Sequence, residues 1–249
     1  MIENITSSSA DEGVRLDVGQ VHVWRISLAE NEGAVQRCRV LLSSDEKERA
    51  SRFYFEKHRR RFVLGRGAMR QILGRYLQLG PEKLVFSYGS KGKPELAECP
   101  NGPQIRFNLS NSDDLAVLAV THEHQVGIDV EFINREFASE EIAHRFFSAH
   151  EVNTLRAVSP DQRAEAFFSC WTRKEAYIKA VGEGLSIPLD SFDVAFGADV
   201  PAALLEVRNA PEGQPQWSMY DLAVPPEFRA ALVVEGEGHR LRHFQWKAE

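Results

Sequence analysis

Residues 167–185 of the 249-residue chain, FFSCWTRKEAYIKAVGEGL, constrain the fold most, because they predict one long helix that ends at two glycines. One stripe of this helix is apolar except for a carboxylate and an ammonium, and comprises Phe168, Trp171, Glu175, Ile178 and Lys179. A carboxylate among apolar neighbours needs a cation, a metal ion or several donors. Lys179 is therefore either the simple ion-pair partner of Glu175 or part of a site with it.

A second stretch, Val126–Phe132 (VGIDVEF), predicts a strand whose alternation places Asp129 and Glu131 on one face. Two neighbouring carboxylates repel each other unless a cation lies between them. Carboxylate oxygens suit a hard divalent ion, Mg²⁺ first. If Glu175 completes the set, the chain has a three-carboxylate metal site. The alternative is an acidic edge strand that faces solvent.

Composition excludes several classes of function. The chain is long enough for one large domain or two small ones, and its 43% hydrophobic and 27% charged residues are typical of a globular protein. A net charge of −6 provides no general basic field for nucleic acid. Three widely spaced cysteines favour a reducing compartment, and no signal peptide or membrane span is predicted. We therefore expect a soluble, cytoplasmic protein without nucleic-acid or membrane partners.

Residues 45–75 are basic although the whole chain is acidic, since they contain ten Lys or Arg and four Asp or Glu. Such a run is either the solvated face of two helices or a site for a polyanion. Gly65 and Gly67 lie within the second predicted helix, where glycine is unfavourable, so they predict close packing against another element.

Two further segments place polar groups at turns. Gly92 and Pro94 flank Lys93 at the tip of a predicted turn, where backbone N–H groups and an ammonium can meet a phosphate, although the P-loop spacing is absent. Ser110 and Asn111 follow a predicted strand and precede the apolar run LAVLAV, so they are either ligand contacts or ordinary turn residues.

The order of elements is similar in two halves of the chain. Residues 18–122 and 126–235 each run strand, helix, helix, strands, without a detectable residue-level repeat. In the second half, Ser148 and Glu151 form a predicted capping box at a helix start. The predicted fold is an α+β chain of two packed α/β halves.

Several motifs together carry a resemblance. FNLSNS, GIDVE, FFSAHE and WTRKEAYIKAVGEGL resemble the 4′-phosphopantetheinyl transferases of the surfactin-synthetase-activating type, and GKP and LSSDEKERASRF fit the same pattern. The motifs occur in order from about residue 41 to about residue 194. The W-x-x-K-E-x-x-x-K run with G-x-D-x-E upstream is the specific part.

The resemblance implies a Mg²⁺-dependent enzyme that moves the phosphopantetheine arm of coenzyme A onto a serine of an apo carrier protein domain. Adenosine 3′,5′-bisphosphate is the other product. The implied fold is a monomeric pseudo-dimer of two similar α/β halves with the ligand cleft between them. Residues 1–124 would recognise the nucleotide and its 3′-phosphate, and residues 125–249 would carry the metal site and the central helix.

The same resemblance implies roles for individual residues. Asp129, Glu131 and Glu175 match metal ligands, Glu175 or Glu131 would take the proton, and Lys179 would offset charge in the transition state. The positions that match coenzyme contacts are Lys47, Arg49, Arg61, Lys93, Pro94, Ser110, Asn111, Lys174 and Lys179.

The chain departs from the family pattern at Asn111, where many relatives carry histidine. Asparagine can donate to a phosphate oxygen but adds no titratable charge. We therefore expect activity to persist, with the 3′-phosphate more dependent on Lys47, Arg49 and Arg61.

The carrier docking surface is the least constrained prediction. Its candidates are apolar groups near the central helix and a neighbouring arginine, namely Tyr177, Ala180, Leu185 and Arg173. The alternative is that Tyr177 and Leu185 belong to the core. Two other functions stay open at this point: a Mg²⁺-dependent pyrophosphohydrolase acting on coenzyme A or a similar diphosphate, and a module that binds coenzyme A without turnover.

Overall fold

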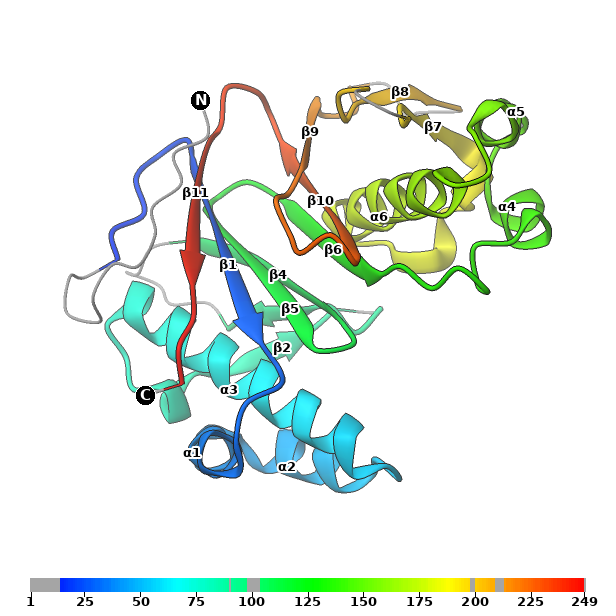
Figure 1. Ribbon diagram of the computed structural model, residues 1–249. Coiled ribbons are helices and arrows are strands. Elements are labelled where there is room, and N and C mark those ends of the chain that lie inside the picture. Colours follow the sequence, from blue (N-terminus) through cyan, green and yellow to red (C-terminus); the bar gives the residue numbers. More distant parts are fainter. Residues whose placement is uncertain (1–13, 90, 98–103, 198–199, 209–212, 249) are drawn as a thin grey trace. The chain divides into compact units, whose positions relative to one another are not determined.

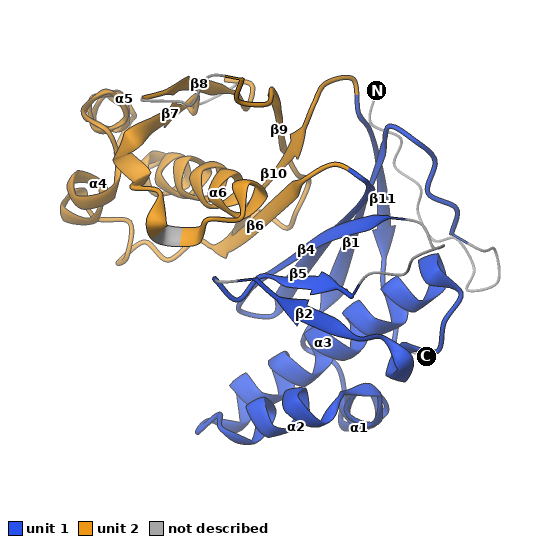
Figure 2. Ribbon diagram, turned by 180° about the vertical axis from the view of Figure 1, so that it is seen from behind, with its two compact units in different colours: residues 1–123, 239–249 blue, residues 124–238 orange. Residues whose placement is uncertain are grey.

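The computed structural model describes residues 14–89, 91–97, 104–197, 200–208 and 213–248 (Figure 1). Its contacts divide the chain into two compact units: unit 1 comprises residues 1–123 and 239–249, and unit 2 comprises residues 124–238 (Figure 2). Each unit contains both helices and strands, so the predicted α+β class is confirmed.

Unit 1 contains six strands, three α-helices and one 3₁₀ turn within the described residues. Its strands are β1 (Gln20–Ser27), β2 (Phe86–Tyr88), β3 (Pro94–Leu96), β4 (Ile105–Ser112), β5 (Leu115–His122) and β11 (Arg240–Gln245). Its helices are α1 (Glu32–Leu41), α2 (Ser44–Ser51), α3 (Glu56–Leu77) and the 3₁₀ turn η1 (Pro81–Lys83). The main sheet has the order β11-β1-β5-β4, and β2 and β3 form a separate hairpin.

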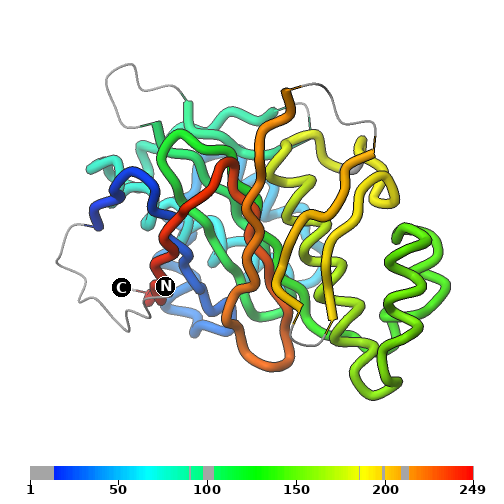
Figure 3. The backbone as a smooth tube through the Cα atoms, turned by 90° about the horizontal axis from the view of Figure 1, so that it is seen from above, coloured from blue at the N-terminus to red at the C-terminus, as the bar shows by residue number. Residues whose placement is uncertain are grey.

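Strand β11 pairs in parallel with β1, and the other neighbours in the main sheet are antiparallel. Figures 1 and 3 show β11, in red, beside β1, in blue. The sequence-based division placed residues 239–249 with the second half, whereas the contacts of this segment belong to unit 1. The sequence of a short strand does not identify its partner, because pairing is decided by contacts remote in sequence.

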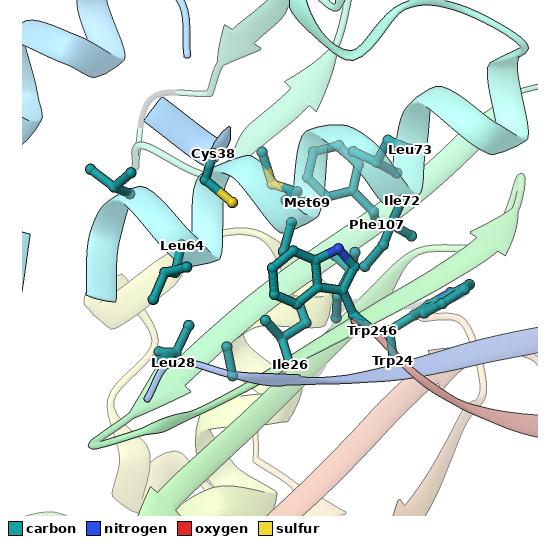
Figure 4. Packing of buried hydrophobic residues seen from close by; sticks show 14 of the residues in the cluster. Trp24, Ile26, Leu28, Cys38, Leu64, Met69, Ile72, Leu73, Phe107 and Trp246 are labelled. Carbon is teal, nitrogen blue, oxygen red and sulfur yellow. The ribbon is translucent and has the colours of Figure 1, made fainter. Parts of the chain in front are cut away.

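The core of unit 1 lies between α3 and one face of the main sheet. Figure 4 shows Trp24 and Ile26 of β1 facing Met69 and Ile72 of α3, with Trp246 beside them. The apolar run LAVLAV forms most of β5, and every residue of β5 up to Thr121 is buried. Burial of this many large apolar side chains is the main source of stability in such a unit.

Unit 2 contains five strands, three α-helices and two 3₁₀ turns within the described residues. Its strands are β6 (Val126–Phe132), β7 (Phe192–Val194), β8 (Leu204–Val207), β9 (Trp217–Asp221) and β10 (Phe228–Glu235). Its helices are α4 (Glu140–Phe146), α5 (Ala149–Ala157), α6 (Arg163–Val181) and the 3₁₀ turns η2 (Gly184–Ser186) and η3 (Leu189–Ser191). One antiparallel sheet has the order β6-β10-β9, and β7 pairs with β8.

Helix α6 is the long helix predicted from the sequence, and it packs on β6 and β10 (Figure 1). It begins four residues before the predicted stretch and ends at Gly182, whose φ of 84° lies in the left-handed region that glycine adopts without strain. No helix in the described ranges of the chain is both long enough and apolar enough to cross a membrane. Cys38 and Cys170 are free and buried, and Cys99 lies outside the described residues.

Candidate active site

The candidate active site is built on a close approach between strand β6 and helix α6. A Cβ atom on Gly127 would lie 2.1 Å from the carbonyl oxygen of Ala176 and 2.2 Å from the backbone nitrogen of Ala180. Only glycine in the strand and small residues in the helix allow the two backbones to come this near. The contact lies in the last turns of α6, which ends at Val181, and it places Lys179 within hydrogen-bond distance of Asp129 in β6.

Asp129, two residues after Gly127, is only 2% exposed, although β6 lies at the edge of its sheet. Its Oδ1 atom accepts a hydrogen bond from Lys179 Nζ at 2.5 Å, and the Lys179 side chain is 30% exposed. The solvent-facing alternative is thus wrong for Asp129. Lys179 was expected to pair with Glu175, four residues before it. Its hydrogen bond instead goes to Asp129, which is 50 residues away in sequence.

The pKa values of Lys179 and Glu175 respond to the carboxylates predicted as metal ligands. Burial works to lower the pKa of Lys179, but Asp129, Glu175 and Glu131 together raise it above the ordinary value. Burial raises the pKa of Glu175, and the neighbouring Asp129 carboxylate raises it further, while Lys179 opposes the rise. The charges of Asp129, Glu131 and Glu175 therefore all act on Lys179, while the ion pair itself is with Asp129.

The donor set of these side chains fits a hard divalent ion. It offers carboxylate oxygens and carries an excess of negative charge, which is the chemistry that Mg²⁺ selects. Within the part of the chain that the structure describes, no three His, Cys, Asp or Glu side chains are gathered as a metal centre. Lys179 holds Asp129 instead, so Asp129 would have to exchange this partner to bind a metal ion.

The predicted phosphate-binding cations of unit 1 lie on α2 and α3. Lys47 and Arg49 are exposed on α2, and the Arg49 guanidinium lies 5.4 Å from the centroid of the Phe62 ring. Arg61 on α3 pairs with Asp113 and Asp114, with N–O distances of 2.5 Å and 2.8 Å. Although burial lowers it, the pKa of Arg61 is raised overall by these two carboxylates. A phosphate at Arg61 would compete with this acidic turn.

Lys93 and Pro94 lie at the hairpin of β2 and β3, where Gly92 has a left-handed φ of 77°. Burial lowers the pKa of Lys93 to about 8. Ser110 and Asn111 do not form a turn: they lie inside β4, opposite Val117 and Ala116 of β5. Ser110 is buried and Asn111 is exposed.

Lys174 lies inside unit 2, with 0% of its side chain exposed and its ammonium bonded to protein groups. Tyr177 is buried, so the core alternative is confirmed for it, and the candidate docking residues Ala180 and Arg173 are buried as well. Tyr177 packs on Phe192, with ring centroids 4.6 Å apart. The side chain of the fourth candidate, Leu185, lies outside the described residues.

Sequence reasoning missed Gly127, which sets the distance between β6 and α6. A glycine inside a strand is a known sign of close backbone approach, and this signal was present in VGIDVEF. It also missed the Asp113–Asp114 pair that holds Arg61, because the contact spans 52 and 53 residues of sequence.

Two family models match the chain. One, described as the 4′-phosphopantetheinyl transferase superfamily, covers residues 125–233, and the other, described as 4′-phosphopantetheinyl transferase, N-terminal, covers residues 24–123. The chain belongs to the 4′-phosphopantetheinyl transferase family.

Individual relatives match over most of their length. The chain is 41% identical over 227 residues to 4′-phosphopantetheinyl transferase HetI of Nostoc sp. (strain PCC 7120 / SAG 25.82 / UTEX 2576), covering 91% of this chain and 92% of the relative. It is 33% identical over 216 residues to 4′-phosphopantetheinyl transferase Sfp of Bacillus subtilis (strain 168), covering 84% and 92%.

A solved structure of a holo-(acyl-carrier-protein) synthase from Bacillus anthracis str. Ames, in complex with CoA (3′,5′-ADP), is similar to 45% of this chain and 94% of that chain, with 23% identity and a TM-score of 0.38. Family membership favours a transferase over the pyrophosphohydrolase and the binding module.

Proposed function

We propose that this protein transfers the 4′-phosphopantetheine arm of coenzyme A to a serine of an apo carrier protein domain and releases adenosine 3′,5′-bisphosphate. The observation that carries the proposal is the 41% identity to a 4′-phosphopantetheinyl transferase over 91% of the chain. The three carboxylates that act on Lys179 support it, because they could hold a divalent cation, and a reaction at a diphosphate needs such a cation to offset phosphate charge.

The residues of β6 and α6 have distinct parts in this proposal. Asp129, Glu131 and Glu175 would hold Mg²⁺, which when bound supplies charge compensation for the diphosphate oxygens. The serine hydroxyl attacks the β-phosphorus, the bond to the bisphosphate leaving group breaks, and the serine proton passes to Glu175, with Glu131 as the rival acceptor. Lys179 would offset the charge that the phosphate oxygens gain in the transition state.

In unit 1, the exposed cations Lys47 and Arg49, together with Arg61, would bind the 3′-phosphate. Lys93 and Pro94 would line the nucleotide, and Ser110 and Asn111 would lie beside the 3′-phosphate. We also propose that the protein works as a monomer in the cytoplasm, and light scattering of the purified protein tests the first part.

Intact mass measurement of several apo carrier domains with the enzyme, coenzyme A and Mg²⁺ tests the function. We expect a gain of one phosphopantetheine group per carrier, which chelation of Mg²⁺ prevents. If coenzyme A is cleaved without carrier modification, the pyrophosphohydrolase alternative is correct. If the mass of no carrier changes, the proposal fails.

The Asp129→Ala variant tests the metal assignment. We expect transfer to fall by about 10³-fold or more, because the variant loses both a ligand and the anchor of Lys179. Calorimetry should show weaker Mg²⁺-dependent binding of coenzyme A. Transfer near the wild-type rate would contradict the metal assignment.

A further inference from the structure

The ammonium of Lys174 directs its hydrogen bonds into unit 2. Nζ lies 2.7 Å from the carbonyl oxygen of Leu189, 2.6 Å from that of Phe192 and 2.8 Å from Glu151 Oε2. A lysine ammonium has three N–H donors. All three are used, and the side chain is 0% exposed, so no donor remains for a phosphate.

Glu151 is equally enclosed, with 0% of its side chain exposed. Besides Lys174, its Oε2 atom accepts from the backbone nitrogen of Ser148 at 2.9 Å, and its Oε1 atom accepts from that of Val194 at 2.9 Å. The predicted capping box at α5 is thus confirmed. The same carboxylate also ties the start of α5 to β7 and to the middle of α6.

Unit 1 contains a similar arrangement with different residues, in which, within the described part of the chain, Glu46 Oε1 has no counterpart of the hydrogen bond that Glu151 Oε1 accepts from Val194. Glu46 closes the capping box of α2, and its Oε2 atom accepts from the Ser43 backbone nitrogen at 3.1 Å and from Arg70 Nε at 2.6 Å. The Arg70 and Glu46 side chains are each 1% exposed. Arg70 Nη1 donates to the carbonyl oxygens of Pro81 and Leu84, both at 3.0 Å.

The acceptors correspond between the units. In each unit the cation binds the carbonyl of the first residue of a 3₁₀ turn and the carbonyl of the residue just after that turn, Pro81 and Leu84 around η1 and Leu189 and Phe192 around η3. Each cation also lies near an aromatic ring, 5.0 Å from the Phe86 centroid in unit 1 and 4.2 Å from the Phe192 centroid in unit 2.

The two arrangements differ in the residue that comes directly after the cation. In α3 this residue is Gln71, which accepts a hydrogen bond from the Trp246 indole at 2.9 Å. In α6 it is Glu175, one of the proposed metal ligands. Among the described residues, the position after the cation in unit 1 is thus a neutral amide and not a carboxylate, so the role of the arrangement there is to hold a helix against the following turn.

We infer that Lys174 and Glu151 are positioning residues for Glu175 and Lys179, and that Lys174 does not contact coenzyme A as its match to the family pattern suggested. The pair fixes the rotation of α6 about its axis, and this rotation decides whether Glu175 faces β6. The inference rests on the proposed function for its activity readout.

The test compares matched double variants in the two units. Lys174→Met with Glu151→Gln removes both charges, and the single amide oxygen of glutamine can still accept one of the two N–H groups, that of Ser148 or that of Val194. Removing both partners also avoids leaving one buried charge unpaired. Arg70→Met with Glu46→Gln makes the same change in unit 1.

We expect the unit 2 variant to lose about 10- to 100-fold in kcat and to need more Mg²⁺ for half-maximal rate, with the KM for coenzyme A changed less than about twofold. The unit 1 variant should show a lower Tm with unchanged kcat below that Tm. A KM or calorimetric Kd for coenzyme A raised about tenfold or more in the unit 2 variant would overturn the inference, as would equal kcat losses in both variants.

Lys174→Arg supplies an independent check, because arginine makes the corresponding contacts in unit 1. We expect it to retain most of the wild-type kcat, and a loss as large as that of the double variant contradicts the inference. If the wild-type protein modifies no carrier, the proposed function fails, whereas coenzyme A binding by the variants still tests the placement of Lys174.

Discussion

The long helix of each unit, α3 or α6, carries its own buried cation, but the two helices differ in the kind of element that they approach most closely. In unit 2, Gly127 of β6 lets α6 lie backbone to backbone against a strand. In unit 1, the close approach is between two helices, since a Cβ atom on Gly67 of α3 would lie 2.3 Å from Cys38 Cβ in α1. This confirms the predicted close packing at Gly67, whereas a Cβ atom on Gly65 would meet only Leu28 Cδ2 at an ordinary 3.9 Å.

The polar groups near the two helices differ in charge and in exposure. In unit 1 the Trp24 indole donates to Tyr76 Oη at 2.8 Å, Tyr76 Oη lies 2.8 Å from His22 Nδ1, and Gln20 Oε1 accepts at 3.0 Å from His22 Nε2. These groups are neutral and enclosed, and His22 is 0% exposed. In unit 2 the Asp129–Lys179 pair is charged and Lys179 is partly exposed. A similar helix can thus hold a sealed neutral network or a reachable charged cluster.

The largest effect should come from adding one methyl group at each close approach. Gly127→Ala forces Cβ into helix backbone, which cannot move aside, so we expect a loss of about 3 kcal/mol or more in unfolding free energy. Because α6 must shift from β6, transfer by the folded fraction should fall as well. Urea denaturation and kcat measured on the same samples separate the two effects.

Gly67→Ala is the matched control. Its Cβ meets Cys38, and we expect a loss of about 1–3 kcal/mol, partly offset by the better helix propensity of alanine. The kcat of the folded protein should stay unchanged. Equal kcat values in both glycine variants would break the distinction between the two helices.

Lys179→Ala should reduce transfer by about 10²-fold with a smaller effect on stability, because its ammonium serves the charged cluster and is partly exposed. Arg75→Ala in α3 is the control, since Arg75 comes after Arg70 at the same interval as Lys179 comes after Lys174. A large drop in Tm with normal turnover would reduce Lys179 to an ion-pair partner of Asp129.

The neutral network predicts acid sensitivity in unit 1. Burial, with help from Arg242, lowers the pKa of His22 to about 3 from 6.5. Between these two pH values the unfolded chain binds a proton that the folded chain refuses, so stability is present above pH 6.5 and falls as the pH decreases. The loss should reach about 2 kcal/mol at pH 5.

Urea midpoints at pH 7.5 and pH 5 for the wild type and for His22→Gln measure this contribution. The variant should be less stable at pH 7.5 but should show a weaker dependence on pH. An identical pH dependence in both proteins would mean that His22 is not the group responsible.

The smallest effect should come from removing a hydroxyl group in each core. Tyr177→Phe loses one hydrogen bond from Gln214 and should cost about 1 kcal/mol without changing transfer. Tyr76→Phe should cost about twice as much, because its hydroxyl bonds both His22 and Trp24. Lower carrier affinity in Tyr177→Phe would return this residue to the docking surface.

Local patterns in the sequence predicted the elements that carry the site. The bounds of β6 and the shared face of Asp129 and Glu131 are set by strand alternation. The prediction of a turn at Ser110 and Asn111 was wrong, because the turn is made by Asp113 and Asp114. Asp113 has a left-handed φ of 47°, and β4 continues through Ser112.

Contacts between distant residues could not be predicted. The rule that favours pairs four residues apart assigned Lys179 to Glu175, whereas the fold supplied Asp129 from another element. The correspondence between Glu46–Arg70 and Glu151–Lys174 was equally hidden, because arginine in one unit and lysine in the other leave no sequence repeat.

The parallel pairing of β11 with β1 has a consequence for synthesis on the ribosome. Residues 124–238, the whole of unit 2, emerge between the two parts of unit 1. The sheet of unit 1 therefore stays one strand short until residues 240–245 have left the exit tunnel. Unit 2 can complete its own contacts earlier, so the later segment of the nascent chain is able to finish folding before the segment made first.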